Sequence, residues 1–498
     1  MKRILFIISF FSLGASAQEI PDALRYAQEN LNGTARFRAM AGAFGAVGGD
    51  LSSLNVNPAG SAIFATNQIG LTLSNYNLST ESKYFGSENI EHDYTLDLNQ
   101  AGGVLVFNND DSKSDWKKFT IGLNYENTNN FDNTIFTSGV NPNNSISNYF
   151  LSYANQNGGV PLNVLTDSFY EELSFQHAQA YLGYQGFIIN PVEDVPGNAA
   201  YVSAVPQGSF YHESTSVATG YNGKLTLNLA ASYKDRLYFG VNFNSYYTDY
   251  WQSSSFLEEN DNDPSGASQR IRFNNDLYTY GSGFSFQAGA IGKVTESFRL
   301  GLSYDSPTWY RLNDELSQYV SNFVIDPETN VASIDAIVDP NVIIVYDTYR
   351  LRTPGKWTGS MAYVFGKLGL LSVDYSIKDY SKMQYAPQND FGGVNNVMTN
   401  TLDMASELRI GAEHRIKQWS LRAGYRWEQS PYRDSETIGD LMSYSGGLGY
   451  DFGRARLDLS YAYIHKDINQ PMFTQGFTDA PEVHKISNNV SLSLFFAL

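Results

Sequence analysis

The 498-residue sequence contains no cysteine, is poor in basic residues and has no long hydrophobic run after its first residues. Without cysteine, neither a disulfide framework nor a lipid-modified cysteine is possible, so strand pairing and packing must hold the fold together. The 33 lysines and arginines against 51 aspartates and glutamates give a net charge of −18. Such an acidic chain lacks the cationic surface that phosphate backbones require, which argues against nucleic acid as a partner.

No later segment offers the roughly 20 consecutive apolar residues of a membrane helix. Aromatic residues are nevertheless abundant, with 35 tyrosines, 31 phenylalanines and 6 tryptophans. Charged residues make up only 17% of the chain, and the mean hydropathy is −0.32. This mixture suits a wall that has one face in lipid and the other in water. A closed β-barrel would satisfy every backbone amide of such a wall inside a membrane.

The first residues have the layout of a secretory signal peptide. Two basic residues precede an apolar stretch from Ile4 to Leu13, and Ala15-Ser16-Ala17 provides a small-residue cleavage site. The apolar stretch is too short to span a bilayer. We therefore predict a signal peptide over residues 1–17 and a mature chain that begins at Gln18.

Apolar and polar residues alternate along most of the chain from about Thr66 onward, which is the pattern of half-buried β-strands. Clear examples are residues 225–233, 371–378, 457–463 and 490–498. Short turns alternate with long polar loops, an asymmetry typical of outer-membrane barrels, whose long loops lie outside the cell. Counting strands between these turns predicts about fourteen, an even number, as such barrels require.

The turns and loops define this count. Tight turns are expected near residues 234–236, 295–297, 366–367, 417–418 and 453–454, and long loops at 81–89, 138–207, 258–267, 314–342, 387–396, 433–439 and 469–482. Two expected strands, 210–233 and 271–294, exceed the roughly 9–11 residues needed to cross a membrane and should form a raised rim. The sequence thus predicts an all-β, transmembrane antiparallel barrel over residues 66–498.

The segment before the first strand, residues 18–65, contains too little periodic hydrophobicity for an independent domain. We predict that it folds back into the barrel as a hatch, or plug. It runs from Gly33-Thr34-Ala35-Arg36 through Ala41-Gly42-Ala43 to Asp50 and the tetrapeptide Asn57-Pro58-Ala59-Gly60. This pattern resembles the N-terminal hatch of the FadL/TodX family of outer-membrane transporters, in which an NPAG signature precedes the first strand.

Further stretches resemble late strands of the same family, namely Val373-Asp374-Tyr375 and Leu421-Arg422-Ala423-Gly424-Tyr425. The resemblance implies a fourteen-stranded barrel with an N-terminal hatch in a bacterial outer membrane. It also implies uptake of long-chain fatty acids or other hydrophobic small molecules, which are captured at extracellular loops and leave sideways through the wall. We expect a monomer surrounded by outer-membrane lipid.

The hatch supplies the candidate site residues. Four apolar residues are predicted to line a substrate pocket, with hatch packing as their alternative role: Phe37, Met40, Phe44 and Phe64. In the hatch motif Asn57-Pro58-Ala59-Gly60, Pro58 fixes φ and Gly60 permits unusual backbone angles. The motif is therefore predicted to shape a turn, with direct gating as the alternative.

The long loop at 138–207 has apolar residues at the spacing of an amphipathic helix, namely Leu162, Leu165, Phe169 and Leu173. Such a helix would either cover the barrel mouth or dock a partner. The second reading leads to an alternative function, a FadL-like surface-binding or secretion-accessory barrel that binds another exported protein.

Chemistry beyond transport has no signature in the sequence. A G-x-S-x-G motif is absent, and the six histidines (His92, His177, His212, His414, His465 and His484) show no metal-ligand spacing. We therefore predict no catalytic residue, no metal site and no cofactor, and hence no enzyme.

Overall fold

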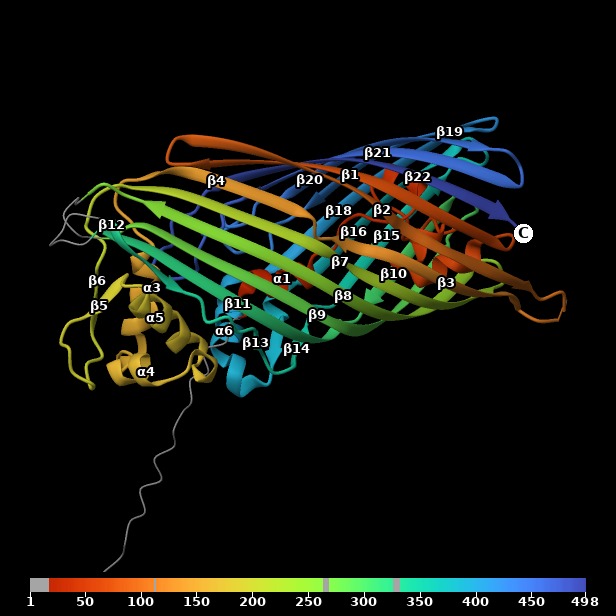
Figure 1. Ribbon diagram of the computed structural model, residues 1–498. Coiled ribbons are helices and arrows are strands. Elements are labelled where there is room, and N and C mark those ends of the chain that lie inside the picture. The colour runs from red at the N-terminus through yellow and green to blue at the C-terminus, as the bar shows by residue number, and fades with distance from the viewer. Residues whose placement is uncertain (1–17, 112, 263–267, 326–331) are drawn as a thin grey trace, which may run out of the picture.

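The computed structural model describes residues 18–111, 113–262, 268–325 and 332–498. The predicted signal peptide lies outside these residues. The chain forms a closed antiparallel barrel whose long loops gather at one end and whose short turns gather at the other (Figure 1). No helix within the described ranges is long and apolar enough to cross a membrane.

Fourteen strands, each hydrogen-bonded to both neighbours, close the cylinder. In order around the wall they are β1 (Gln68–Tyr84), β2 (Ser87–Asn108), β3 (Trp116–Asn130), β7 (Phe210–Tyr233), β8 (Leu237–Glu259), β9 (Ser268–Lys293), β10 (Phe298–Asp305), β15 (Lys356–Val364), β16 (Gly369–Asp379), β18 (Met404–Ile416), β19 (Trp419–Glu428), β20 (Leu441–Asp451), β21 (Ala455–Ile468) and β22 (Glu482–Ala497). The last strand, β22, pairs with β1 from Gln68↔Ala497 to Lys83↔Glu482. The predicted strand count is confirmed.

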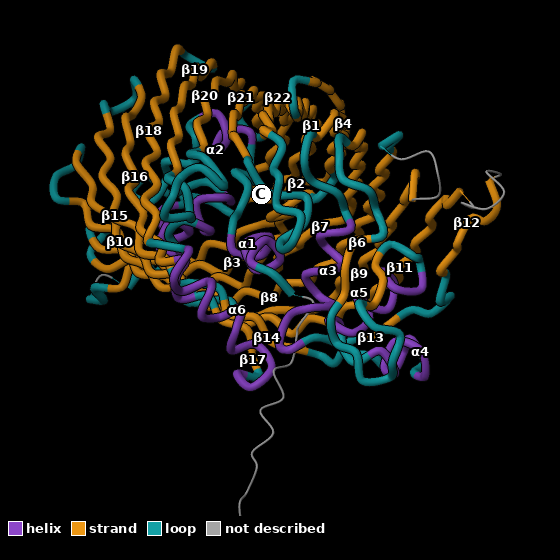
Figure 2. The backbone as a smooth tube through the Cα atoms, turned by 90° about the vertical axis from the view of Figure 1, so that its left-hand side faces the viewer, coloured by secondary structure: helices purple, strands orange, loops and turns teal. Residues whose placement is uncertain are grey.

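Further elements extend the wall at the extracellular end. These strands are β4 (Asn133–Asn141), β11 (Trp309–Ile325), β12 (Ala332–Val338), β13 (Ile344–Val345), β14 (Tyr349–Arg352) and β17 (Gln384–Ala386). A small separate hairpin joins β5 (Ile189–Pro191) to β6 (Tyr201–Ser203). The helices at this end are α3 (Ser147–Asn155), α4 (Leu162–Asp167), α5 (Phe175–Gln185) and α6 (Gln388–Thr401). They lie on one side of the opening (Figure 2).

The outer face of the wall is apolar, and the inner face is polar. On β7, Leu225, Leu227 and Leu229 are about 40% exposed, whereas the intervening Thr226 and Asn228 are fully buried. Exposed tryptophans mark the edges of the apolar band, for example Trp419 beside a short turn. Such a band, bordered by aromatic residues, is how a barrel matches the lipid bilayer. The wall therefore belongs in an outer membrane.

Three segments predicted as loops are regular structure. The prediction of a loop at 81–89 is wrong, because β1 and β2 continue to a two-residue turn at Phe85–Gly86, both with positive φ. Likewise, the first part of the predicted loop at 314–342 belongs to strand β11, which extends through Ile325. Most of the predicted loop at 387–396 lies in helix α6. Above the membrane the outward face of a strand meets water instead of lipid, so the sequence of the β1–β2 hairpin lacks the apolar–polar alternation that reveals a strand.

The amphipathic helix predicted from Leu162 to Leu173 is also wrong. Helix α4 ends at Asp167, since Ser168 adopts an extended conformation with φ −97° and ψ 151°. Leu162 and Leu165 are buried as expected, but Phe169 is 69% exposed. The larger helices of this loop are α3 and α5. They pack on lumen-facing side chains of the extended strands, including Phe256 and Phe273.

The N-terminal segment lies inside the barrel as predicted (Figures 1 and 2). Its elements are α1 (Ile20–Ala27), α2 (Ala35–Ala39) and two 3₁₀ turns, η1 (Leu51–Asn55) and η2 (Pro58–Ile63). Helix α2 packs against β19–β22, and η2 packs against β7, β8 and β9 on the opposite wall. The hatch thus spans the lumen from wall to wall.

Candidate substrate pathway and hatch

Buried ion pairs and hydrogen bonds fix the hatch to the wall. Arg36 Nε lies 2.8 Å from Glu413 Oε2 on β18, and the same carboxylate oxygen receives Arg422 Nε at 2.7 Å. On β16, Asp374 Oδ2 accepts hydrogen bonds from the backbone N–H groups of Phe44 (2.9 Å) and Gly45 (3.0 Å). Asp374 is the centre of the late-strand motif Val373-Asp374-Tyr375, so this motif holds the hatch.

The hatch motif 57–60 joins two parts of the hatch to the wall. Asn57 Oδ1 accepts a hydrogen bond from the Ala59 N–H (3.1 Å), which caps η2, and its Nδ2 donates to Gly45 O (2.8 Å) and Ala290 O (3.1 Å). Gly60, which was expected to permit unusual backbone angles, has no positive φ. Glycine is needed there for space, because a Cβ would lie 2.7 Å from Ser53 Oγ.

The predicted pocket residues are brought together only in part. Phe37, Met40 and Phe44 share one cluster, in which the rings of Phe37 and Phe44 are 5.4 Å apart. Phe64 lies in a different cluster with Leu54 and Phe495. All four side chains are at most 4% exposed. In this conformation they pack the hatch, so a ligand would reach them only after the hatch moves.

Above the hatch core, α1 packs into a buried aromatic cluster that we call the tyrosine layer. It consists of side chains from α1, β8, β11, β14 and β17: Tyr26, Tyr246, Tyr310, Tyr349 and Tyr385. Tyr26 and Tyr246 lie 5.3 and 5.6 Å from Tyr310 between ring centroids. Sequence reasoning missed this layer, because each tyrosine comes from a different element. For the four tyrosines that lie on strands, the only sequence signal was an inward position in the strand.

Below the tyrosine layer lies a belt of buried charges. Lys356 Nζ is 3.2 Å from Asp305 Oδ2 and 3.7 Å from Glu29 Oε2 of the hatch. Close by, at the same hatch residue, Arg426 donates to Glu29 O (3.5 Å), and its Nε is 2.6 Å from Glu407 Oε1. Moving an apolar molecule through this ionic layer would strip these groups of their partners, which is costly. The barrel axis is therefore a poor route for a hydrophobic compound.

The wall loses its backbone pairing between β2 and β3. The two strands pair from Asn108↔Lys118 up to Gln100↔Glu126, and no further. Above this point β4 pairs only with β7. Side-chain hydrogen bonds replace the ladder, for example from Asn130 Nδ2 to Asp97 Oδ2. We call this place the β2–β3 gap.

Hatch residues 30–33 connect the two sides of the β2–β3 gap. On the β2 side, the Gly33 N–H donates to Oδ1 of Asn99, the residue that bulges out of the β1–β2 ladder. On the β3 side, the Asn30 N–H donates to Thr128 O (3.3 Å), and Asn32 Nδ2 donates to Asn127 O. The hatch therefore closes the lumen and bridges the interrupted wall with one segment.

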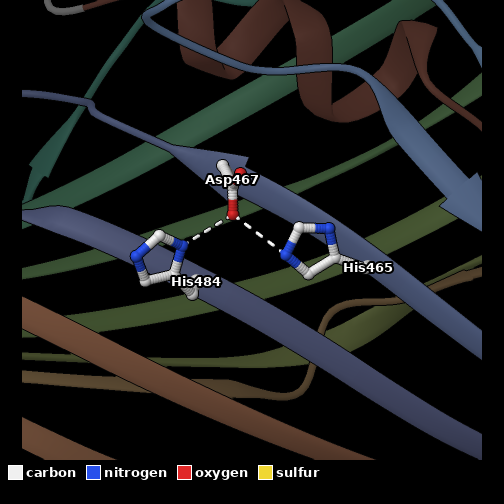
Figure 3. A group of neighbouring side chains, drawn as sticks. All are labelled: His465, Asp467 and His484. Carbon is white, nitrogen blue, oxygen red and sulfur yellow. Dashed lines mark hydrogen bonds and ion pairs between the residues drawn. The ribbon is translucent and has the colours of Figure 1, made fainter.

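On the outer surface the structure brings together three potential metal ligands (Figure 3). Asp467 Oδ1 lies 3.1 Å from His465 Nε2 on the same strand and 2.7 Å from His484 Nδ1 on β22. No sequence pattern indicated this group, because strand pairing and not sequence spacing places His484 beside Asp467.

A closed fourteen-stranded barrel with an apolar outer face and an internal hatch defines an outer-membrane channel protein of bacteria. Residues 202–486, which are 285 of the 498 residues, match the family model "Outer membrane protein transport protein (OMPP1/FadL/TodX)". The chain belongs to this FadL/TodX family. Its members are transport channels for hydrophobic compounds, and the chain is accordingly not an enzyme.

Solved structures show the same fold at low sequence identity. A FadL homologue of Pseudomonas aeruginosa is 14% identical with a TM-score of 0.52, and the match covers 94% of this chain and 99% of that one. The Pseudomonas putida toluene transporter TodX is 14% identical with a TM-score of 0.50, with 95% and 100% covered. No curated protein sequence matches the chain.

Proposed function

We propose that this protein takes up long-chain fatty acids or similarly apolar small molecules, which enter from the extracellular loops and leave sideways at the β2–β3 gap. The observation that carries the proposal is the bridging of this gap by hatch residues 30–33. Displacement of this segment would open the lumen and, at the same time, remove the hydrogen bonds that join β2 to β3 across the gap. The protein would act as a monomer within the membrane.

The route begins at exposed apolar side chains of the extracellular loop, such as Phe169 (69% exposed) and Phe187 (59%). It continues to the tyrosine layer, where α1 separates the upper lumen from the hatch core. The ionic layer below then favours a sideways exit. A lipid-like molecule gains roughly 0.8 kcal/mol for each CH₂ kept out of water, a gain that an aqueous exit would forfeit.

Phe37, Met40, Phe44 and Phe64 remain the proposed substrate contacts within the hatch. Because they are buried at present, they would meet the substrate only in an open state. A structure determined with bound oleate or toluene tests this assignment. Ligand density confined to the tyrosine layer would remove the four residues from the site.

The exit route is tested by cross-linking the gap in a chain that has no native cysteine. Cysteines at Asp97 and Asn130, joined by a short bismaleimide, would hold β2 to β3. A control pair at Ser253 and Asp276 joins two strands that are already continuously paired. We expect the gap cross-link to lower uptake of radiolabelled oleate or toluene into cells by about tenfold or more. The control should leave uptake intact, and full uptake through the cross-linked gap would refute lateral exit there.

Docking of another exported protein is the second candidate function, and the exposed Phe169 and Phe187 favour it. The two functions differ in what they require of the gap. A docking protein would function normally with the gap cross-linked and would lose its partner when both phenylalanines are replaced by serine.

A further inference from the structure

The wall contains a second irregularity, on the side remote from the β2–β3 gap. The ladder between β10 and β15 ends at Asp305↔Lys356, and pairing resumes between β11 and β14 at Trp309↔Arg352. Proline occupies both strands of the interruption, at Pro307 and Pro354, and supplies no N–H for a ladder. The wall stays closed there, because the Thr353 N–H donates to Thr308 O at 3.0 Å.

This interruption leaves a hollow of 260 Å³ in the outer surface. Its apolar part is formed by Tyr304, Trp357, Ile377 and Met404, and its polar part includes Arg352 and Lys382. Trp357 is 50% exposed and Met404 is 54% exposed. An apolar hollow on the lipid-facing side of a barrel is filled by a lipid chain when the protein is in a membrane.

Two exposed cations, Arg352 and Lys382, line the hollow, and the strand register places two more, Arg350 and Arg311, beside Arg352. Arg311 and Arg350 stand directly opposite each other on paired strands, an arrangement that is destabilising without a counterion. Among the described residues, none of the four forms an ion pair. The one carboxylate lining the hollow, Asp379, accepts hydrogen bonds from the N–H and hydroxyl of Ser381.

The strand register places these cations at the edge of the apolar band. Arg311 lies in one row with Ser282 and Tyr247, and Arg352 lies opposite Trp309. Aromatic side chains of this kind mark the height of the lipid headgroups. The protein has a net charge of −18, yet these unpaired cations lie close together and repel one another. An anionic lipid headgroup at this height would neutralise them.

We propose that this surface is a binding site for a phosphorylated lipid of the outer leaflet, of the lipid A type. Its phosphate would lie between Arg350, Arg352 and Lys382, within reach of Arg311, and one acyl chain would occupy the hollow. Arginine suits this role, because its guanidinium donates two parallel hydrogen bonds to phosphate oxygens. The site lies outside the route proposed for the transported substrate.

Native mass spectrometry of the full barrel in detergent tests the proposal, with monophosphoryl lipid A and chemically dephosphorylated lipid A as probes. A variant with Arg311, Arg350, Arg352 and Lys382 changed to glutamine should bind the phosphorylated probe at least about tenfold more weakly. A control variant neutralises four exposed cations at the short turns, Lys113, Lys367, Lys417 and Arg454, and should bind normally.

Equal binding of the two probes, or unchanged binding by the neutralised variant, would overturn the proposal. Should the quadruple variant fail to migrate as a folded barrel in unheated gels, Arg350→Gln and Lys382→Gln are measured singly. Each single variant is then expected to bind the phosphorylated probe severalfold more weakly. If both bind it as tightly as the native protein does, the proposal is overturned.

A separate observation supports a second proposal: we infer that His465, Asp467 and His484 bind a divalent transition-metal ion such as Zn²⁺. Two imidazoles and a carboxylate are a ligand set that Zn²⁺ accepts. The three donor atoms already lie within 4.8 Å of one another, and a tetrahedral ion would hold them about 3.3 Å apart. The side chains are 33–44% exposed and free to make this small adjustment. Glu81 of β1, paired in register with His484, would supply a fourth ligand by leaving its ion pair with Lys83, whose Nζ lies 2.7 Å from Glu81 Oε1.

Isothermal titration calorimetry with Zn²⁺, on barrel purified without a histidine tag, tests this site. The double variant His465→Ala/His484→Ala should lose at least about tenfold in affinity. His92→Ala, a change of another exposed histidine, serves as the control. The inference fails if the native barrel shows no saturable heat or if the double variant matches it.

Discussion

Arg36 of the hatch and Glu413 of the wall form a buried ion pair, with Nε and Oε2 2.8 Å apart. The two residues are 377 positions apart in the chain. This contact fixes α2 against β18 at a point where neither charge meets water. The hatch is therefore held by electrostatics and by shape, and several consequences can be measured.

Replacing Glu413 by glutamine should loosen the hatch, because Arg36 and Arg422 would lose their shared carboxylate. Breaking a buried pair in this way costs about 3–5 kcal/mol. We expect open-channel events in planar bilayers that the native protein lacks. Glu407→Gln removes a carboxylate from Arg409 and Arg426, both on the wall, and should not produce these events. Identical recordings for the two variants would contradict an anchoring role for Arg36.

The stability of the hatch should depend more on the hydrogen bonds donated by Asn57 Nδ2 than on the capping of η2 by Asn57 Oδ1. Asn57→Asp keeps the oxygen that caps η2 but removes the hydrogen bonds to Gly45 O and Ala290 O, while Asn57→Ala removes all three. Each buried carbonyl left without a partner costs about 1–3 kcal/mol. Hydrogen exchange over residues 45–63 should therefore rise strongly in both variants. Protection retained by Asn57→Asp would show that the cap alone matters.

Gly301 of β10 should tolerate no side chain. A Cβ at this position would lie 2.3 Å from Gly45 O of the hatch, so alanine must displace the hatch backbone. Overpacking of this kind costs about 1–3 kcal/mol. Gly359→Ala on the neighbouring strand β15 meets nothing within 4 Å and is the matched control. Unfolding midpoints in guanidinium should fall for Gly301→Ala alone, and equal midpoints would argue against tight hatch packing.

The attachment of α1 should weaken as the pH rises. Burial raises the pKa of Glu19 from 4.5 to about 7, and nearby Asp22 adds to this effect, while a hydrogen bond with Thr474 opposes it. The folded state thus retains a proton that the unfolded state loses above about pH 4.5. The contribution of Glu19 to the free energy of unfolding therefore falls by up to about 3 kcal/mol between about pH 4.5 and 7. Above about pH 7 this contribution no longer changes.

Hydrogen exchange of residues 20–27 should accordingly be faster at pH 8 than at pH 5, after correction for intrinsic rates. Glu19→Gln cannot ionise and should remove this difference. A pH effect of equal size in the variant would assign the dependence to another group.

Alternation in the sequence was enough to predict the lipid-facing wall, since each strand must show apolar residues to the membrane at every second position. Leu225, Leu227 and Leu229 illustrate this constraint. It disappears above the membrane, where the β1–β2 hairpin looked like a loop. Helix α4 stopped short of Phe169 because local backbone geometry overrode apolar spacing.

The interior was far less predictable. Phe37 and Phe44 meet because they are close in sequence, whereas Phe64 is drawn to Phe495 at the far end of the chain. Ionic partners such as Arg426 and Glu407 lie on inward positions that the strand pattern reveals, but the pairing itself depends on register. The break between β10 and β11 coincides with Pro307, but it was not identified from the sequence, because it also depends on Pro354 in the adjacent strand.

The lack of clearance between hatch and wall constrains biogenesis. Wall glycines approach the hatch backbone so closely that a Cβ would lie 2.3 Å from Pro58 C at Gly240 and 2.4 Å from Ala41 N at Gly424. Threading the hatch into a finished cylinder would require these contacts to open and re-form. Such packing favours an assembly in which the seam between the first and last strands joins around an N-terminal segment that is already in place.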